Sequence, residues 1–147
     1  MDAERKGEGS PTVARGRLEE LKHLEAGERA LAAAFVEHAH DADSVARFLR
    51  LGERHRQHAL ILAERIVALG GTPLADPDDY WILGDLADEV TLVEAEQNAL
   101  HAYHDHLLDF DPDTARLIRD RIIDEHENAL AELTEAPSSM LDFLEHA

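Results

Sequence analysis

Histidine and glutamate residues recur at helical spacing in this chain, and the side chains of both can bind metal ions. His55 and His58 stand three residues apart in the middle of an apolar helical face, so both imidazoles can reach one ion or a close pair of ions. Imidazole and carboxylate groups are common ligands of transition metals. The pattern predicts a metal site made of histidine nitrogens and carboxylate oxygens.

Three other segments carry similar polar residues where an apolar stripe would otherwise continue. A buried carboxylate costs several kcal/mol unless it is paired or binds a metal ion. Convergence of such residues from four helices therefore favours a metal between the helices. The candidate ligands are Glu25, Glu28, His55, His58, Glu94, Gln97, Glu125 and His126.

Some of these candidates have a second interpretation. Glu25 and Glu94 lie at the edges of their stripes, where they either bind the ion or form ion pairs with an arginine such as Arg29, Arg54 or Arg119. In the last segment the apolar pattern favours His126 facing inward, and the neighbouring Glu125 is the alternative. His101 and His104, taken singly, are more typical of hydrogen-bonded or half-exposed histidines.

Apolar residues at spacings of three and four predict four helices that would position these side chains. Polar and Gly-containing residues 1–12 are predicted to form a disordered tail, the bundle covers 13–137, and 138–147 are predicted to form a short C-terminal helix. The four predicted helices cover 13–40, 45–69, 85–110 and 114–135. The predicted core face of the third is Leu86, Val90, Val93, Leu100 and Leu108.

The connection GTPLADPDDYWILG between the second and third helices decides the topology. Fifteen extended residues span up to about 50 Å, more than the roughly 39 Å of a 26-residue helix. The sequence thus predicts an all-α bundle of two antiparallel hairpins joined by a long crossover, with an up-down bundle as the alternative. Tyr80 and Trp81 in this connection are predicted to pack on the bundle or to contact a second subunit.

The two hairpins also resemble each other weakly. LEAGERAL at 24–31 aligns with VEAEQNAL at 93–100 at an offset of 69, and His55 aligns with His126 at an offset of 71. This similarity indicates either an internal repeat or the chance likeness of helices rich in Ala, Leu and Glu.

Composition narrows the functional classes. A net charge of −18, from 32 acidic and 14 basic residues, argues against sequence-independent nucleic-acid binding. The absence of cysteine excludes disulfides and thiolate metal sites. Without an apolar run of about 20 residues or a secretory signal, we expect a soluble cytoplasmic protein that binds no membrane. A homodimer or larger homo-oligomer is expected.

The chain resembles the ferritin-like superfamily, in particular bacterioferritin and rubrerythrin, over residues 14–135. The resemblance is carried by HLEAGERAL, LVEAEQNAL and RHRQHALILAERIVALGG. It implies a ferritin-like bundle that holds two iron ions and oxidises or handles iron as a diiron-type oxidoreductase. Glu25 and Glu94 would be the single glutamates of the first and third helices, and His58 the histidine of the second.

The chain departs from the family pattern at the Glu-x-x-His motifs. His55 stands where the second helix of the family has glutamate, and the fourth helix offers Glu125-x-x-Asn128 or His126-x-x-Ala129. Extra imidazole shifts the preference toward zinc, copper or nickel, or toward one iron ion instead of two. We therefore expect an iron-binding protein with iron oxidation or iron handling. The alternatives are a non-catalytic zinc-binding bundle and a purely structural bundle acting in stress response or assembly.

Overall fold

The fold is seen in a computed structural model, which describes residues 11–39, 45–77, 81–82 and 89–134. The predicted tail up to residue 10, the predicted C-terminal helix at 138–147 and Tyr80 lie outside the described residues. Residues 11 and 12, predicted to belong to the tail, are helical.

Every regular element in the described ranges is helical, which confirms the predicted all-α class. Helix α1 covers Pro11–Ala39, α2 covers Val45–Ala68 and α3 covers Glu89–His106. The fourth helix starts with α4, Pro112–Ile118, continues through a π-helical turn at Arg119–Ile123 and remains helical to residue 134.

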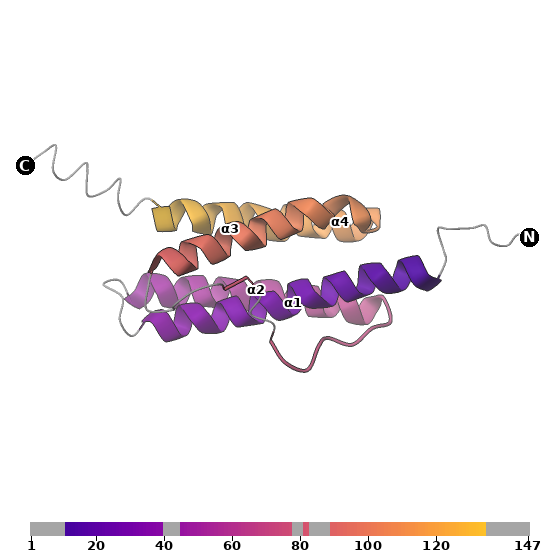
Figure 1. Ribbon diagram of the computed structural model, residues 1–147, viewed down its shortest axis with the longest axis horizontal. Helices are drawn as coiled ribbons and strands as arrows, with labels where there is room; N and C mark the ends of the chain where they lie inside the picture. Colours follow the sequence, from indigo (N-terminus) through magenta and orange to yellow (C-terminus); the bar gives the residue numbers. More distant parts are fainter. Residues whose placement is uncertain (1–10, 40–44, 78–80, 83–88, 135–147) are drawn as a thin grey trace, which may run out of the picture.

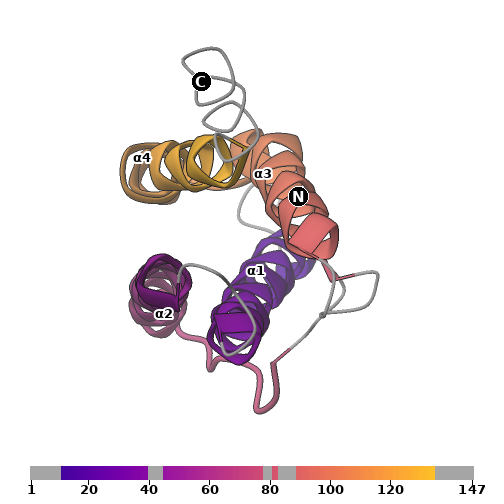
Figure 2. The ribbon, with the colours of Figure 1, turned by 90° about the vertical axis from the view of Figure 1, so that its left-hand side faces the viewer.

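The four helices surround one central region (Figures 1 and 2), with α3 over α1 and α4 over α2. His106 at the end of α3 lies 3.3 Å from Glu20 near the start of α1, so these two helices are antiparallel. Arg65 near the end of α2 lies 3.0 Å from Asp111, which precedes α4. Side chains at the middle of each helix can therefore meet at the centre.

Local sequence explains where α4 begins and where α2 ends. The Asp111 carboxylate accepts a hydrogen bond from the backbone N–H of Thr114 at 3.1 Å and caps α4, and Pro112 occupies the first turn. Gly70 adopts a positive φ of 90° just after α2. The N–H of Gly71 then donates to the carbonyl of Ile66 at 2.9 Å, which closes a Schellman motif and ends the helix.

Helix α3 differs from its prediction in its end and in its buried face. The α-helix ends at His106, and a 3₁₀ turn, Leu107–Asp109, leads to the buried Phe110. Val90 and Leu108, predicted to face the core, are 57% and 94% exposed. The core face instead carries Leu92, Ala95, Glu96, Ala99 and Tyr103.

Trp81 closes one side of the bundle, as predicted for this segment. Its side chain is 2% exposed, and its ring centroid lies 6.0 Å from that of Tyr103. The amide of Asn98 donates to the carbonyl of Trp81 at 3.1 Å. Gly27 leaves the space for the indole, because a Cβ at this position would lie 2.8 Å from the ring.

Gly27→Ala is expected to destabilise the fold by about 1–2 kcal/mol. The added methyl group forces the indole of Trp81 to move, and overpacking of this kind costs more than the helix propensity gained. Thermal unfolding measures the loss, and tryptophan emission should shift to longer wavelength because Trp81 is the single tryptophan. An unchanged Tm with unchanged emission would contradict this packing.

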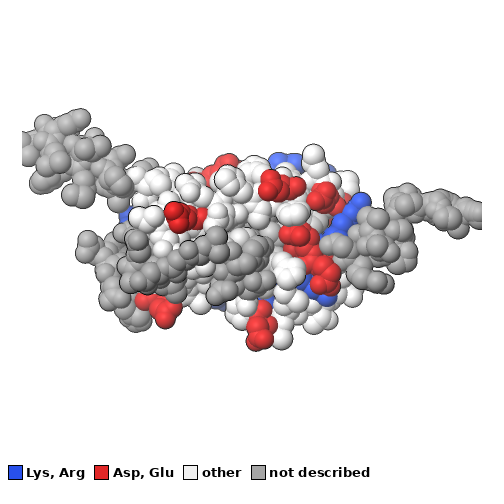
Figure 3. Space-filling model, viewed as in Figure 1, with Lys and Arg blue, Asp and Glu red and all other residues white. Residues whose placement is uncertain are grey.

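The described surface carries many acidic side chains. On the face shown in Figure 3, acidic groups are spread along the visible described surface, and fewer basic groups are seen. No helix within the described ranges combines the length and apolarity needed to cross a membrane.

Candidate metal centre

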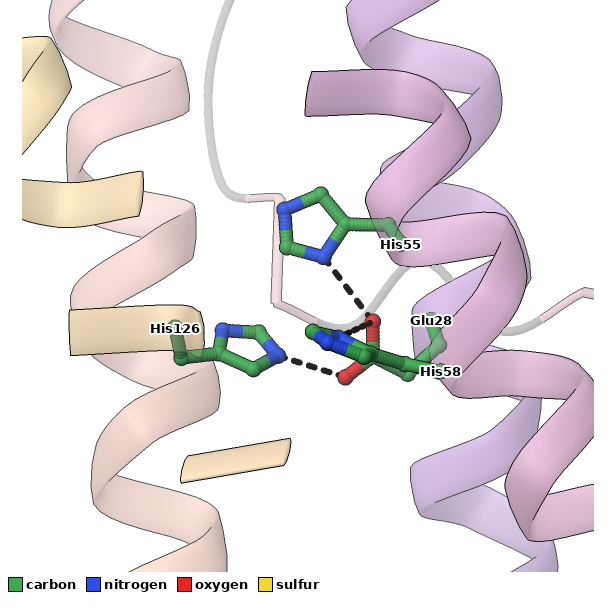
Figure 4. Close-up of side chains that lie close together, drawn as sticks. All are labelled: Glu28, His55, His58 and His126. Carbon is green, nitrogen blue, oxygen red and sulfur yellow. Dashed lines mark hydrogen bonds and ion pairs between the residues drawn. The ribbon is translucent and has the colours of Figure 1, made fainter. Parts of the chain in front are cut away.

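Four buried side chains from three helices meet at the centre of the bundle (Figure 4). Glu28 comes from α1, His55 and His58 come from α2, and His126 comes from the fourth helix. All four are fully buried. One potential ligand atom from each lies within 4.8 Å of those of the other three. This spacing suits four ligands that surround one ion.

The Glu28 carboxylate is the common neighbour of the three imidazoles. Its Oε1 lies 2.9 Å from Nδ1 of His55 and 3.5 Å from Nδ1 of His58. Its Oε2 lies 2.5 Å from Nε2 of His126 and accepts a hydrogen bond of 2.5 Å from the hydroxyl of Tyr103. One nitrogen of each imidazole thus faces the same carboxylate.

The second nitrogen of each imidazole contacts a carboxylate other than that of Glu28. Glu96 of α3, also fully buried, binds Nε2 of His55 and lies 2.9 Å from Nδ1 of His126. Nε2 of His58 lies 2.6 Å from the carboxylate of Glu125. A carboxylate on the far nitrogen is the usual way in which proteins orient a metal-binding histidine and fix its tautomer.

The hydrogen bonds also indicate which ring nitrogens of the cluster carry protons. An ionised carboxylate only accepts hydrogen bonds, and both ring nitrogens of His55 and of His126 contact carboxylate oxygens. Both nitrogens of each ring must therefore carry protons. Two imidazolium cations then neutralise the carboxylates of Glu28 and Glu96.

The pKa values follow the same pairing. Burial alone would raise the pKa of the Glu28 carboxyl, but His126 and His58 outweigh it and hold the pKa well below its usual 4.5. The pKa of Glu96 is likewise lowered to about 2 against burial by His55 and His126. Burial would lower the pKa of His126, yet Glu28 and Glu96 raise it to about 10. The pKa of His55 is raised in the same way, chiefly by Glu96.

One atom of the cluster is not satisfied by these pairs. Nδ1 of His58 is buried, faces Glu28 and makes no hydrogen bond within the described part of the chain. A buried polar atom without a partner costs about 1–3 kcal/mol. An ion bound between Glu28 and the three imidazoles would supply the missing partner, so the residues present fit a metal ion.

The structure brings half of the predicted ligand set into the cluster and places the other half outside it. Glu28, His55, His58 and His126 lie in the cluster. Glu25 is buried, but its carboxylate binds the Arg29 guanidinium at 2.9 Å, which was its second interpretation.

The predicted inward facing of α3 is wrong for two residues. Gln97, expected at the centre of the stripe, is exposed, and so is Glu94. The physical reason is a rotation of the buried face by about one residue, which places Glu96 at the centre. On the fourth helix His126 faces inward, and the half-exposed Glu125 reaches the cluster from outside through His58.

Glu96 and Tyr103 are the site residues that the sequence reasoning missed. Glu28 and Glu96 are 68 residues apart (96 − 28), one fewer than the offset of the predicted repeat. At an offset of 68, Leu24 aligns with Leu92 and Phe35 with Tyr103, and all four are buried. The pairing of these large side chains is the signal that could have identified Glu96.

No protein-family model matches the chain, and no curated protein sequence matches it at a significant level. The geometry of the cluster is therefore the basis on which a function is inferred.

Proposed function

We propose that the protein binds one transition-metal ion at the centre of its helical bundle. The ligands are Nδ1 of His55, Nδ1 of His58, Nε2 of His126 and one oxygen of Glu28. The observation that carries the proposal is the orientation of the three imidazoles, each with one nitrogen toward Glu28 and the other on a second carboxylate. This is the arrangement of metal-binding histidines with orienting carboxylates.

The ligand set supports one ion in place of two. Three nitrogens and one carboxylate oxygen complete a four-coordinate shell, which is typical of zinc and also binds iron, cobalt or nickel. The hydrogen bonds of Glu96 to described residues are with the far nitrogens of His55 and His126. A second ion at Glu96 would have to share both imidazoles with the first ion.

Iron oxidation or iron handling is the second candidate function. It is supported by the directions of the helices, since α2 and α3 both run antiparallel to α1 (Figure 1). A ferritin-like bundle has this arrangement and joins its hairpins by one long crossover. Glutamates from α1 and α3 facing histidines from the other two helices also match the order of donors in that fold.

Metal analysis of the purified protein, followed by addition of Fe²⁺ in air, separates the candidates. One ion per chain without oxidation supports the single-ion site, and oxidation of bound Fe²⁺ supports the second candidate. Two ions per chain would contradict a single four-coordinate site. Neither bound metal nor thermal stabilisation by Zn²⁺ or Fe²⁺ would leave only a structural bundle.

His58→Ala is expected to weaken metal binding by about 100-fold or more, whereas His104→Ala should change it less than about twofold. His58 faces Glu28 inside the bundle, while His104 is half-exposed beside Glu127 at 4.0 Å. Losing one of four ligands costs roughly 3 kcal/mol, which is about 100-fold in affinity. Titration of each metal-free variant with Zn²⁺ against a competing chelator measures the two affinities. Equal losses would place the ion elsewhere.

A further inference from the structure

We infer that the metal ion reaches the buried cluster through the surface between α2 and the fourth helix, with Glu125 as its first ligand. The inference rests on the proposed metal site and identifies how that site is filled. An ion needs a route into the bundle, because all four ligand residues are fully buried.

Glu125 joins the cluster to the surface. Its side chain is 48% exposed, yet its carboxylate lies 2.6 Å from Nε2 of the fully buried His58. It also lines a surface depression of about 370 Å³ between the two helices. The Glu125 carboxylate and the His58 imidazole therefore lie between a hydrated cation in this depression and Glu28.

His58 is the imidazole best suited to pass an ion inward. It makes one hydrogen bond, to Glu125, whereas His55 and His126 each make two. Its other nitrogen, Nδ1, faces Glu28 and has no hydrogen-bond partner among the residues that the structure describes. Once the ion displaces the bond to Glu125, the ring can swing aside and let the ion reach Nδ1 and Glu28 without breaking another hydrogen bond.

The charges around the depression make its carboxylate decisive. Arg50 there is paired with Glu132, and Glu53 is paired with Arg56. The remaining charged groups are Arg54, Arg121 and Glu125. Because two guanidinium groups oppose a cation, removing the Glu125 charge should slow uptake and removing an arginine charge should speed it.

Stopped-flow mixing of the metal-free full chain with Co²⁺, followed by visible absorption, tests the route. Glu125→Gln is expected to lower the association rate constant at least about tenfold, and Arg121→Gln to raise it about threefold. The matched control is Glu127→Gln, two residues along the same helix and 53% exposed, which should associate at the wild-type rate.

The outcomes separate the route from the site. Association of Glu125→Gln at the wild-type rate, or equal slowing by Glu127→Gln, overturns the route while the metal site stands. A wild-type chain that binds no Co²⁺ overturns the proposed site and the route together. If Glu125→Gln changes only the dissociation rate constant and leaves the association rate constant unchanged, Glu125 only orients His58. This result also overturns the route.

Discussion

Glu28→Gln is expected to reduce the affinity for Zn²⁺ by roughly 100- to 1,000-fold and to destabilise the metal-free fold by about 3–5 kcal/mol. The Glu28 carboxylate faces all three imidazoles. Replacing the carboxylate with a neutral amide removes the negative charge that balances His126. The buried imidazolium is then left without an anionic partner on Nε2. Competition titration with Zn²⁺ and denaturant unfolding of the metal-free protein measure the two effects.

Glu25→Gln provides the matched control for this substitution. Glu25 lies one turn earlier on the same helix and is also buried, but its carboxylate binds Arg29. We expect its Zn²⁺ affinity to remain within about threefold of wild type, because only an ion pair outside the cluster is lost. A larger loss for Glu25→Gln than for Glu28→Gln would support the ligand set implied by the ferritin resemblance and contradict the one seen here.

The stability of the metal-free protein is expected to be highest between about pH 4.5 and 6.5. The raised pKa values of His55 and His126 stabilise the fold fully below pH 6.5. This contribution is lost as the pH rises through the raised pKa values, and the pKa of His126 is about 10. The lowered pKa values of Glu28 and Glu96 stabilise it fully above pH 4.5. This contribution is lost as the pH falls through the lowered pKa values, and the pKa of Glu96 is about 2.

Metal binding is expected to follow the opposite pH dependence above pH 6.5. Ligation displaces protons from Nδ1 of His55 and Nε2 of His126, so affinity should rise by up to about 100-fold per pH unit. Between pH 6.5 and 9 the Tm with chelator should fall by at least about 5 °C. Over the same range the difference between the Tm with Zn²⁺ and the Tm with chelator should grow. A metal-free Tm that rises over this range would mean that the imidazolium–carboxylate pairs do not exist.

The sequence was sufficient to predict α1 and α2 but not the facing of α3. The large residues Phe48, Leu51, Leu62 and Ile66 mark the inner face of α2, and all are buried. On the inner face of α3 the small residues Ala95 and Ala99 lie between Leu92 and Tyr103, while the large apolar Val90 lies outside. Hydrophobic periodicity is weighted by large residues, so it selected the wrong face and with it Gln97 in place of Glu96.

The apolar pattern correctly favours His126 over Glu125 as the inward residue, and a π-helical turn aligns His126 with the buried start of the fourth helix. Thr114, Ile118, Ile122 and His126 are spaced by four and all are buried. Twelve residues at about 100° each would turn His126 about 120° away from Thr114 in a regular α-helix. The π-helical turn at Arg119–Ile123 absorbs one residue and reduces this angle to about 20°.

The alternation of Glu28, His55, Glu96 and His126 has a consequence for the origin of such a site. The two helices of each hairpin contribute one glutamate and one histidine, so a single hairpin paired with its own copy about a two-fold axis would build the same ring. A gene duplication would then join the copies, and later substitutions could differ between the halves. At the 71-residue offset His58 corresponds to Ala129, and Arg54 to Glu125. The third imidazole and its exposed carboxylate are thus where the two halves diverge, and this difference would place a bound ion off the axis and toward Glu28.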